Sequence, residues 1–297
     1  MSVRDVIIQR GGFATTRQLL AAGASERMLT AAVRSGAAHR VRNGWYSTLD
    51  PSDPRFRAVR VGGRLTGLSA FEVWGGWVWR RPPLVQVCVP ANAARLRAVA
   101  GVELHYDDAP GGTASEVSVV SAMTRVLLDE EPEVAIPCVD WALRTGRADR
   151  IDVERAFLSL PLPRREVSRL VDWRSQSVLE SVARVRLRQA GFRVRSQQKT
   201  GDLGGSDLTI EGSVVLETDG RKFHEKSFES DRRRDLVTTI EGRHVIRASY
   251  SMVRDEWPAI LAAIRAALAS RYVGSSGDFV RVGPSRQRSH RRQGQVS

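Results

Sequence analysis

Apolar positions follow three patterns along the chain, and each pattern predicts a different kind of structure. Over residues 1–50 they recur at helical spacing in 3–9, 16–22 and 26–33. The segment HRVRNGWYS then alternates polar and apolar residues around an Asn-Gly pair, which favours a tight hairpin turn. Three short helices followed by a hairpin are the order of a winged helix-turn-helix, which we predict for this stretch.

The middle stretch, residues 51–172, mixes strand and helix patterns. PPLVQVCVP predicts a strand bounded by prolines, and the tryptophans of LTGLSAFEVWGGWVW predict core because few basic residues interleave them. Amphipathic helices are predicted over 120–128, 134–143 and 153–160. These patterns predict a middle α/β region.

Short strands dominate the C-terminal stretch, residues 173–272. The expected elements are a helix over 177–190, strands at 192–196, SDLTI and VVLETDG, a helix opened by SFESDRRRDL, the strand HVIRAS and a helix over 257–268. This αβββαβα order predicts an α/β sandwich whose second and third strands carry acids. Residues 273–297 have little apolar content and predict a disordered basic tail. The whole chain is therefore predicted to be a multi-domain α/β protein.

The charge of the chain indicates a polyanionic partner. Its 297 residues carry a formal net charge of +13, which suggests DNA rather than a membrane, because no long basic amphipathic helix stands out. The first residues lack the apolar core of a signal peptide, and no run of about 18 apolar residues occurs. Cys88 and Cys138 stand alone, which excludes a zinc finger and a disulfide scaffold. We expect a cytoplasmic protein.

The stretch VVLETDGRKFH carries the most informative chemistry. Side chains alternate along a strand, so Glu217 and Asp219 project together, and a hairpin brings Asp207 of SDLTI to the same place. Carboxylates so close repel unless a cation lies among them, and hard oxygen ligands suit Mg²⁺, with Mn²⁺ as the substitute. A solvated strand end without a ligand explains this segment about as well.

Two further features of the sequence bear on this site. Glu180 follows Ser177 at capping-box spacing, so it either reaches back to its own helix terminus or projects toward the acids of the hairpin. The three lysines of the chain, Lys199, Lys222 and Lys226, all flank the acidic hairpin. Lysine is a usual cation of metal-dependent nuclease sites, so the position of these three lysines adds slightly to the prediction of such a site.

Basic residues also mark the N-terminal stretch. Arg27 and Arg34 lie on the third predicted helix, which would enter the major groove, and the hairpin would carry Arg40 and Arg42 to phosphates. The alternative is a small helical subdomain that binds protein.

The C-terminal blocks VLES, SDLTI, VVLETDG, KFH, DRRRDL and EGRHVIR, in that order, resemble the very-short-patch-repair-endonuclease-like (Vsr-like) domain of the PD-(D/E)XK nuclease superfamily. The resemblance covers about residues 177–270. HRVRNGWYS, LTGLSAFEVWGG and VVSAMTRVLLD resemble the winged-helix part of AbiEi-family antitoxins of type IV toxin–antitoxin systems, and this N-terminal match is looser.

The resemblance to the nuclease implies roles for single residues. Asp207 and Glu217 would be metal ligands, with the carbonyl of Thr218 as the third, and Glu180 would be the acid on the first helix. Asp219 occupies a slot where the superfamily usually has lysine, which leaves the general base open.

The remaining implied roles fall on the residues after the hairpin. His224 is the best substitute for the missing base, with Lys222 behind it. Asp231 and Arg234 match a D-x-x-R element that would brace the site or touch DNA, and Arg247 would meet a phosphate.

Together these features predict a metal-dependent endonuclease that hydrolyses DNA phosphodiester bonds in repair or defence. The alternative is a DNA-binding transcriptional regulator of the antitoxin type, with an inactive nuclease fold and a cognate toxin protein as its partner. The two readings differ in whether the acids converge.

Overall fold

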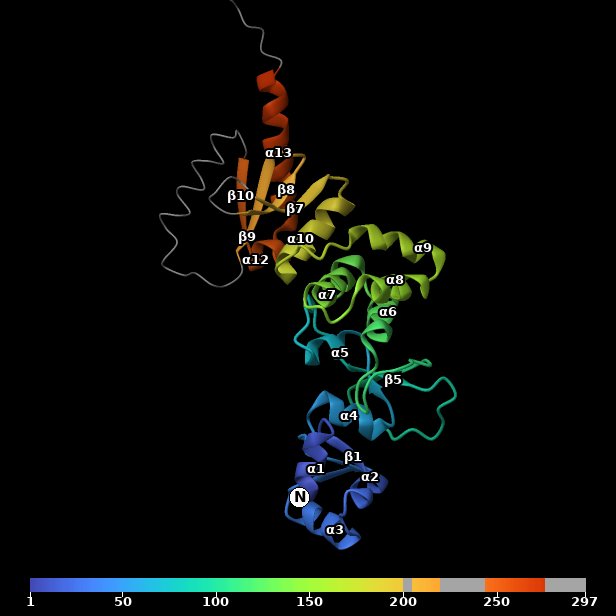
Figure 1. Cartoon of the computed structure of the whole chain (residues 1–297). Coiled ribbons are helices and arrows are strands. Elements are labelled where there is room, and N and C mark those ends of the chain that lie inside the picture. The colour runs from blue at the N-terminus through green and yellow to red at the C-terminus, as the bar shows by residue number, and fades with distance from the viewer. Residues whose placement is uncertain (200–204, 220–243, 276–297) are drawn as a thin grey trace, which may run out of the picture.

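The computed structural model describes residues 1–199, 205–219 and 244–275, and shows a mixed α/β protein. Three sheets are formed, one in each of three parts that follow one another in chain order along an elongated molecule (Figure 1). The predicted helix opened by SFESDRRRDL and nearly all of the predicted tail lie outside the described residues. No helix within the described ranges is long and apolar enough to span a membrane.

The N-terminal part combines three helices with a three-stranded sheet in the order β1-β3-β2. Its helices begin at the side chains of Ser2, Thr15 and Ser25, each of which accepts a hydrogen bond from a backbone N–H of the first turn. Apolar residues of these helices pack with Tyr46 in a core that is separate from that of the middle part. The elements are α1 (Val3–Gln9), β1 (Phe13–Thr15), α2 (Thr16–Ala21), α3 (Glu26–Arg34), β2 (His39–Arg42) and β3 (Trp45–Ser47).

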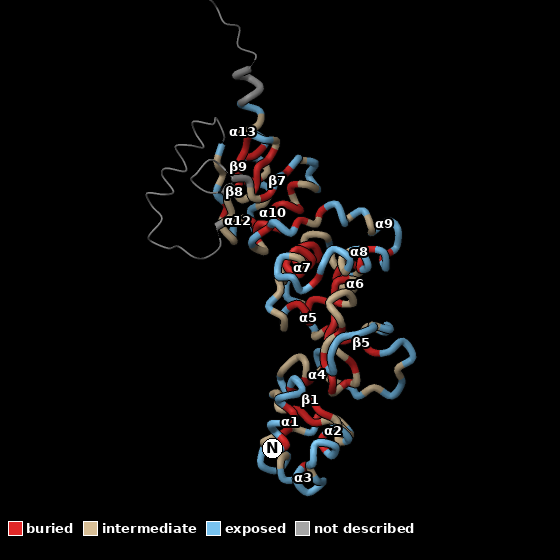
Figure 2. Tube along the Cα trace, in the orientation of Figure 1, coloured by how far each residue is buried: buried red, intermediate tan, exposed pale blue. Residues whose placement is uncertain are grey.

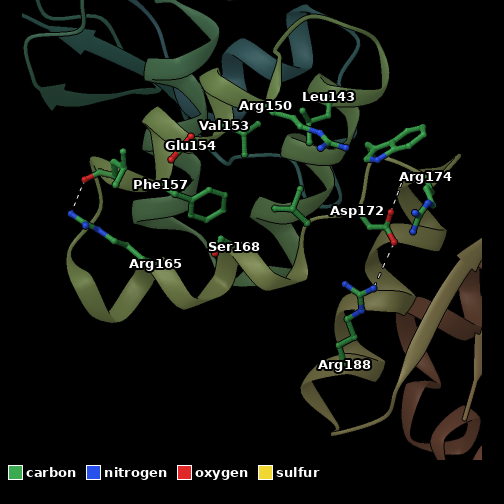
Figure 3. A pocket seen from close by; sticks show the side chains of 13 residues that line it. Leu143, Arg150, Val153, Glu154, Phe157, Arg165, Ser168, Asp172, Arg174 and Arg188 are labelled. Atoms are coloured by element: carbon green, nitrogen blue, oxygen red, sulfur yellow. Dashed lines mark hydrogen bonds and ion pairs between the residues drawn. The ribbon is translucent and has the colours of Figure 1, made fainter.

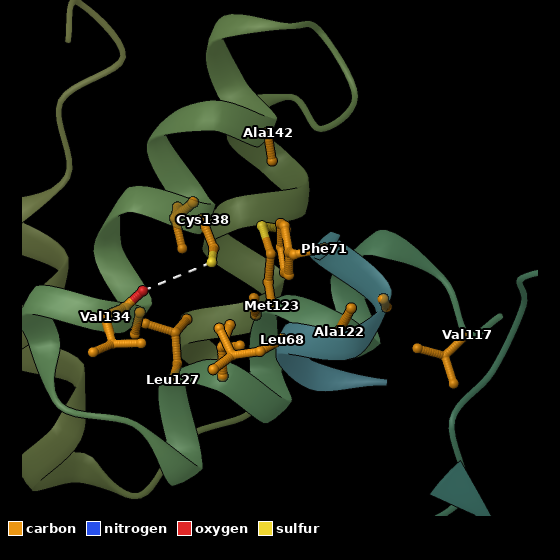
Figure 4. Close-up of a cluster of buried hydrophobic side chains, with 14 of the residues drawn as sticks. Leu68, Phe71, Val117, Ala122, Met123, Leu127, Val134, Cys138 and Ala142 are labelled. Atoms are coloured by element: carbon orange, nitrogen blue, oxygen red, sulfur yellow. Dashed lines mark hydrogen bonds between the residues drawn. The ribbon is translucent and has the colours of Figure 1, made fainter. Parts of the chain in front are cut away.

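The middle part packs helices against a short sheet in the order β4-β5-β6, and its core is the largest in the protein (Figure 4). The three tryptophans at 74, 77 and 79 pack against that core, as predicted. The elements are α4 (Pro54–Val61), β4 (Arg64–Leu65), α5 (Gly67–Val73), β5 (Val85–Val89), β6 (Val102–Tyr106), α6 (Val119–Asp129), α7 (Pro132–Arg144), α8 (Arg150–Leu158), α9 (Leu162–Arg165) and the 3₁₀ helix η1 (Glu166–Leu170).

The C-terminal part is a four-stranded sheet in the order β10-β9-β8-β7 with helices packed against it. Strands β7, β8 and β9 are antiparallel neighbours, and β10 returns parallel to β9. The acids at 207 and 217 lie on β8 and β9, the second and third strands, as predicted. The elements are α10 (Val178–Gln189), β7 (Val194–Lys199), β8 (Gly205–Ile210), β9 (Val214–Asp219), β10 (His244–Ser249), α12 (Tyr250–Asp255) and α13 (Trp257–Ser275).

Helix α10 joins the middle and C-terminal parts because it is buried on more than one side (Figure 2). Leu179, Val182 and Leu187 belong to the core of the C-terminal sheet, whereas Val185 belongs to the core of the middle part. One helix therefore supplies apolar contacts to two cores.

A buried ion pair fixes α10 to α7. Arg184 and Asp140 are both fully buried, and a guanidinium nitrogen of Arg184 lies 2.5 Å from Asp140 Oδ2. Asp140 also accepts hydrogen bonds from the Ser181 hydroxyl at 2.5 Å and the Asp172 backbone N–H at 2.7 Å. Burial raises the pKa of Asp140 to about 6, against the lowering effect of Arg184, so the carboxyl remains ionised at neutral pH.

A second arginine bridges the same two parts nearer the surface. Arg186 Nε lies 2.6 Å from a carboxylate oxygen of Glu133 on α7. Its guanidinium lies 5.7 Å from the ring centroid of Trp79 and 5.4 Å from that of Trp257. Such cation–π contacts add to the ion pair and hold α10 between the two parts.

Candidate functional site

The candidate site lies where β8 and β9 separate. Their pairing runs from Ile210↔Val214 to Leu208↔Leu216. Beyond this pair the backbones no longer pair with each other, and the Asp207 side chain bonds to β9 instead. Its Oδ2 accepts from the Thr218 backbone N–H at 2.8 Å and from the Thr218 hydroxyl at 3.1 Å. Because the N–H and C=O of a strand residue point to the same neighbour, the Thr218 carbonyl also faces Asp207.

Glu217 precedes Thr218 on β9 and turns to the other neighbouring strand. Strand β10 places Arg247 directly beside it in the parallel register. Arg247 Nε donates to Glu217 Oε2 at 3.1 Å, and the Glu217 side chain is largely buried while that of Arg247 is partly exposed. Asp207 and Glu217 therefore lie on adjacent strands, and each uses one carboxylate oxygen for a protein contact.

Glu180 forms half of the capping box that the sequence predicted. Its backbone N–H donates to the Ser177 hydroxyl, which caps α10. Its carboxylate does not close the reciprocal bond to Ser177. Instead, Oε2 accepts from the Gln176 backbone N–H and Oε1 from the Gln197 side-chain amide, each at 2.8 Å. The cap is present, and the carboxylate projects toward β7.

The electrostatics of Glu180 connect it to the hairpin. Burial is the main reason why the pKa of Glu180 rises to about 7, and the negative charge of Asp207 raises it further. The amide donors of Gln197 and Gln176 act in the opposite direction. Glu180 thus titrates near neutral pH, which is where a group that exchanges protons in a reaction is most useful.

Gln197 is a site residue that the sequence analysis missed. In the β7–β8 register Ser196 pairs with Leu208 and Gln198 with Ser206, so Gln197 lies opposite Asp207 without pairing to it, and its φ of 49° is left-handed. The Gln197 side-chain amide donates to Glu180 Oε1, and its Oε1 accepts from the Gln176 amide, each at 2.8 Å. Strained backbone of this kind is typical of functional sites.

The donor set is suited to a hard cation but is incomplete. Asp207 Oδ1 and Glu217 Oε1 have no hydrogen-bond partner among the described residues. The Thr218 carbonyl faces Asp207, so these three oxygens are available to a cation. Burial is the main cause of the raised pKa of Glu180, and a cation would relieve the smaller contribution that comes from the charge of Asp207. No group of three or more His, Cys, Asp or Glu side chains that could hold a metal occurs within residues 1–199, 205–219 and 244–275.

Several predicted site residues fall outside the description. The backbone of Asp219 ends β9, but its side chain is not described. Lys222, His224, Asp231 and Arg234 lie outside the described residues. The general base named from the sequence therefore stays a prediction.

Three of the predicted DNA-binding arginines are exposed on the N-terminal part. Arg27 and Arg34 lie on α3, of which only Leu29 is buried. Arg40 lies in the β2–β3 hairpin and donates to the Asn43 side chain at 2.9 Å. Figure 1 shows α3 at the end of the molecule, away from the middle part, so its outer face is open to a partner.

Arg42 is placed differently from what the sequence predicted. It is half-buried, its guanidinium lies 5.4 Å from the Trp45 ring centroid, and burial lowers its pKa. With Gly62 and Arg64 it lines a cavity between the hairpin and the middle part. The β-bulge between Arg40 and Arg42 explains the difference, because one extra residue turns consecutive basic side chains in different directions.

Comparisons with known proteins add no family. A scan against protein-family models finds no match, and a search of curated proteins finds no similar sequence.

Proposed function

We propose that the chain is a DNA-binding, Mg²⁺-dependent endonuclease with an N-terminal winged helix and a C-terminal restriction-endonuclease-like sheet. One observation carries the proposal: Asp207 and Glu217 lie on adjacent strands, with the buried Glu180 close enough to Asp207 for its charge to raise the pKa of Glu180. The α10-β7-β8-β9-β10 order, with β10 parallel to β9, supports it.

Asp207, Glu217 and the Thr218 carbonyl would hold the metal. When bound, Mg²⁺ would polarise the scissile phosphate and lower the pKa of a coordinated water. Glu180 would hold or release a proton beside Asp207 at neutral pH, since its pKa is about 7. Arg247, already beside Glu217, would offset negative charge on a bound phosphate.

The N-terminal part would supply most of the affinity for DNA. Arg27 and Arg34 on the open face of α3 would meet the major groove and its phosphates, and Arg40 on the hairpin would contact the backbone. Binding by arginines to phosphates releases counterions, so affinity should fall steeply with salt. Such binding is expected whether or not the chain cleaves DNA.

The test is nicking of supercoiled plasmid with Mg²⁺ or Mn²⁺ by the full-length protein and by Asp207→Asn. The substitution keeps an oxygen that can accept from Thr218 but removes the charge, so we expect metal-dependent nicking to be lost and DNA binding to be retained. Glu211→Gln is the matched control, because Glu211 lies in the turn between β8 and β9 and pairs with Arg193 on the surface.

A second candidate is a DNA-binding regulator of the antitoxin type with an inactive nuclease fold, working with a toxin protein. The Arg247–Glu217 ion pair favours it, because an arginine that neutralises Glu217 can make a metal unnecessary. Equal inactivity of the parent protein and Asp207→Asn with both metals, together with salt-sensitive DNA binding, would contradict the nuclease and support the regulator.

A further inference from the structure

A cavity of about 630 Å³ is lined by residues of the middle part and of α10, and it includes none of the acids at 180, 207 and 217 (Figure 3). Helix α8, the turns from α9 through η1, and the segment that leads into α10 surround it. Its volume is within the ~300–1,000 Å³ that is usual for sites of small organic ligands.

The wall of the cavity is apolar and includes an exposed aromatic ring. Val153, Phe157 and Val171 form part of this wall. Trp173 also lines the cavity, and 50% of its surface is exposed. The other six tryptophans of the chain, all in the described ranges, are buried or half-buried. An accessible indole beside an apolar wall is suited to stacking against a flat ring.

Four arginines also line the cavity, and they fall into two pairs. Arg165 and Arg188 are committed to the fold: Arg165 donates to the Leu160 carbonyl at 2.9 Å, and Arg188 donates to the Val194 carbonyl and lies 3.6 Å from Asp172. Arg150 and Arg174 are exposed, and the guanidinium of neither forms an ion pair within the described part of the chain, although the Arg174 backbone N–H donates to Asp172 at 3.1 Å.

The two uncommitted arginines lie near the exposed tryptophan. The Arg174 guanidinium lies 5.9 Å from the ring centroid of Trp173. Figure 3 shows Arg150 and Arg174 toward the same end of the cavity and Arg165 toward the other end. A ligand with a flat ring and an anionic group would contact the indole and these two guanidinium groups together.

We propose that this cavity binds one unpaired nucleotide, with its base against Trp173 and the apolar wall and its phosphate on Arg150 and Arg174. Glu154 and Ser168 line the same cavity and supply polar atoms for the edge of a base. The nucleotide comes either from a single-stranded segment of DNA or from the free pool, and the chemistry of recognition is shared.

The charge of the chain excludes two other occupants. A second copy carries the same net charge of +13, and the segment 276–297 of this chain contains five arginines and one acid. Both are repelled by a cavity that has two uncommitted arginines. The proposal concerns binding only and does not require that the C-terminal acids cleave DNA.

The test is fluorescence polarisation of the full-length protein in EDTA, so that no metal-dependent cleavage occurs. The probes are a labelled strand of about twelve thymidines and a strand of equal length whose central nucleotides are abasic. Because stacking of a base on an aromatic side chain is worth a measurable part of affinity, we expect the thymidine strand to bind roughly ten-fold tighter.

Substitutions in the cavity test whether the preference for the thymidine strand comes from this site. Trp173→Ala should remove most of the preference while leaving the affinity for the abasic strand nearly unchanged, and Trp173→Phe should retain part of the preference. Arg150→Ala and Arg174→Ala should weaken binding of both strands. The controls are Tyr106→Ala, which removes a ring that is 55% exposed on β6, and Arg144→Ala, which removes an exposed arginine beside Leu143.

Competition separates the two sources. Displacement by thymidine monophosphate indicates a site for free nucleotides, whereas a thymidine preference that the monophosphate does not affect indicates a site for a nucleotide within a strand. Equal affinity for the two strands, or a preference that Trp173→Ala leaves intact, would overturn the proposal. A third result would also overturn it: the protein shows no preference for bases but binds poly-glutamate, and Trp173→Ala abolishes that binding. The cavity would then bind an acidic polypeptide rather than a nucleotide.

Discussion

Two buried carboxylates, Asp140 of α7 and Glu180 in the first turn of α10, are stabilised in different ways. Asp140 lies against the guanidinium of Arg184 and accepts from a hydroxyl and a backbone N–H. Glu180 accepts from a backbone N–H and a side-chain amide but forms no ion pair with any described residue. Burial raises the pKa of both, to about 6 for Asp140 and about 7 for Glu180.

The difference separates a structural acid from an acid that is available for chemistry. A buried carboxylate with a fixed cation beside it and hydrogen bonds to both oxygens holds two helices together. A buried carboxylate held only by amides remains sensitive to whatever positive charge arrives, whether a proton or a metal ion. The asymmetry supports a structural role for Asp140 and a functional role for Glu180.

The largest expected effect comes from breaking the structural pair. Arg184→Met leaves Asp140 charged and without its guanidinium in the core, and should lower the free energy of unfolding by about 3–5 kcal/mol. Chemical denaturation followed by circular dichroism measures the loss. The double variant Asp140→Leu/Arg184→Met removes both charges and should recover most of it. A double variant as unstable as the single one would show that the guanidinium acts through packing rather than charge.

The next effect is the pH dependence that comes from Glu180. Its pKa rises from 4.5 in the unfolded chain to about 7 in the fold, so between these values the folded protein binds the extra proton. Stability from this group is therefore complete below about pH 4.5 and is lost as pH rises through about 7, by roughly 3 kcal/mol. Glu180→Gln, measured by denaturation at several pH values, should reduce the fall and leave the part that comes from Asp140, whose pKa is also raised, to about 6.

Mg²⁺ sharpens the same measurement. A cation among Asp207, Glu217 and Thr218 would oppose the charge of Asp207 on Glu180, so added Mg²⁺ should reduce the fall in stability that the parent protein shows between about pH 4.5 and 7. Glu180→Gln should show a smaller response. Identical pH profiles with and without the metal would contradict a cation site beside Asp207.

The smallest effect concerns the amide that holds Glu180. Gln197→Ala removes one hydrogen bond to a buried carboxylate and should cost about 1–2 kcal/mol at pH values where Glu180 is ionised. Gln197→Gly should cost less, because glycine adopts the φ of 49° without strain. Thermal melting distinguishes them, with Gln189→Ala at the exposed end of α10 as the control. A Gly variant less stable than the Ala variant would contradict backbone strain at Gln197.

Sequence patterns predicted the longer elements well because periodicity needs several turns or alternations to be visible. The helix over 3–9 was predicted with the bounds that α1 has, and the helix over 177–190 and the strand SDLTI lie within a few residues of α10 and β8. Short elements were missed, such as β1 with three residues and α12 with six, since tertiary contacts decide their conformation.

Of the candidate site, the sequence predicted only those residues whose role follows from their own type and spacing. The acids at 207 and 217 could be located by alternation on two strands, and the cap at Ser177 by its spacing. Gln197 gave no signal, because its role depends on a left-handed backbone conformation within β7 that no local pattern encodes. Asp140 did carry one: it is a charged residue inside the apolar run IPCVDWAL of a predicted helix, which indicates a buried partner.

The shared helix α10 limits how this protein can be divided. A fragment that begins at Trp173 would carry Val185 and Arg184 into solvent without α7, while the fragment left behind would keep Asp140 with no counter-ion. Proteolysis between the two parts or genetic exchange of one of them would therefore damage both. The middle part and the C-terminal sheet are expected to be inherited, expressed and engineered as one block. The N-terminal helices have a core of their own, but Phe13 and Val41 of the N-terminal sheet share a second core with Phe56 and Val59 of α4, so this part too is attached to the block.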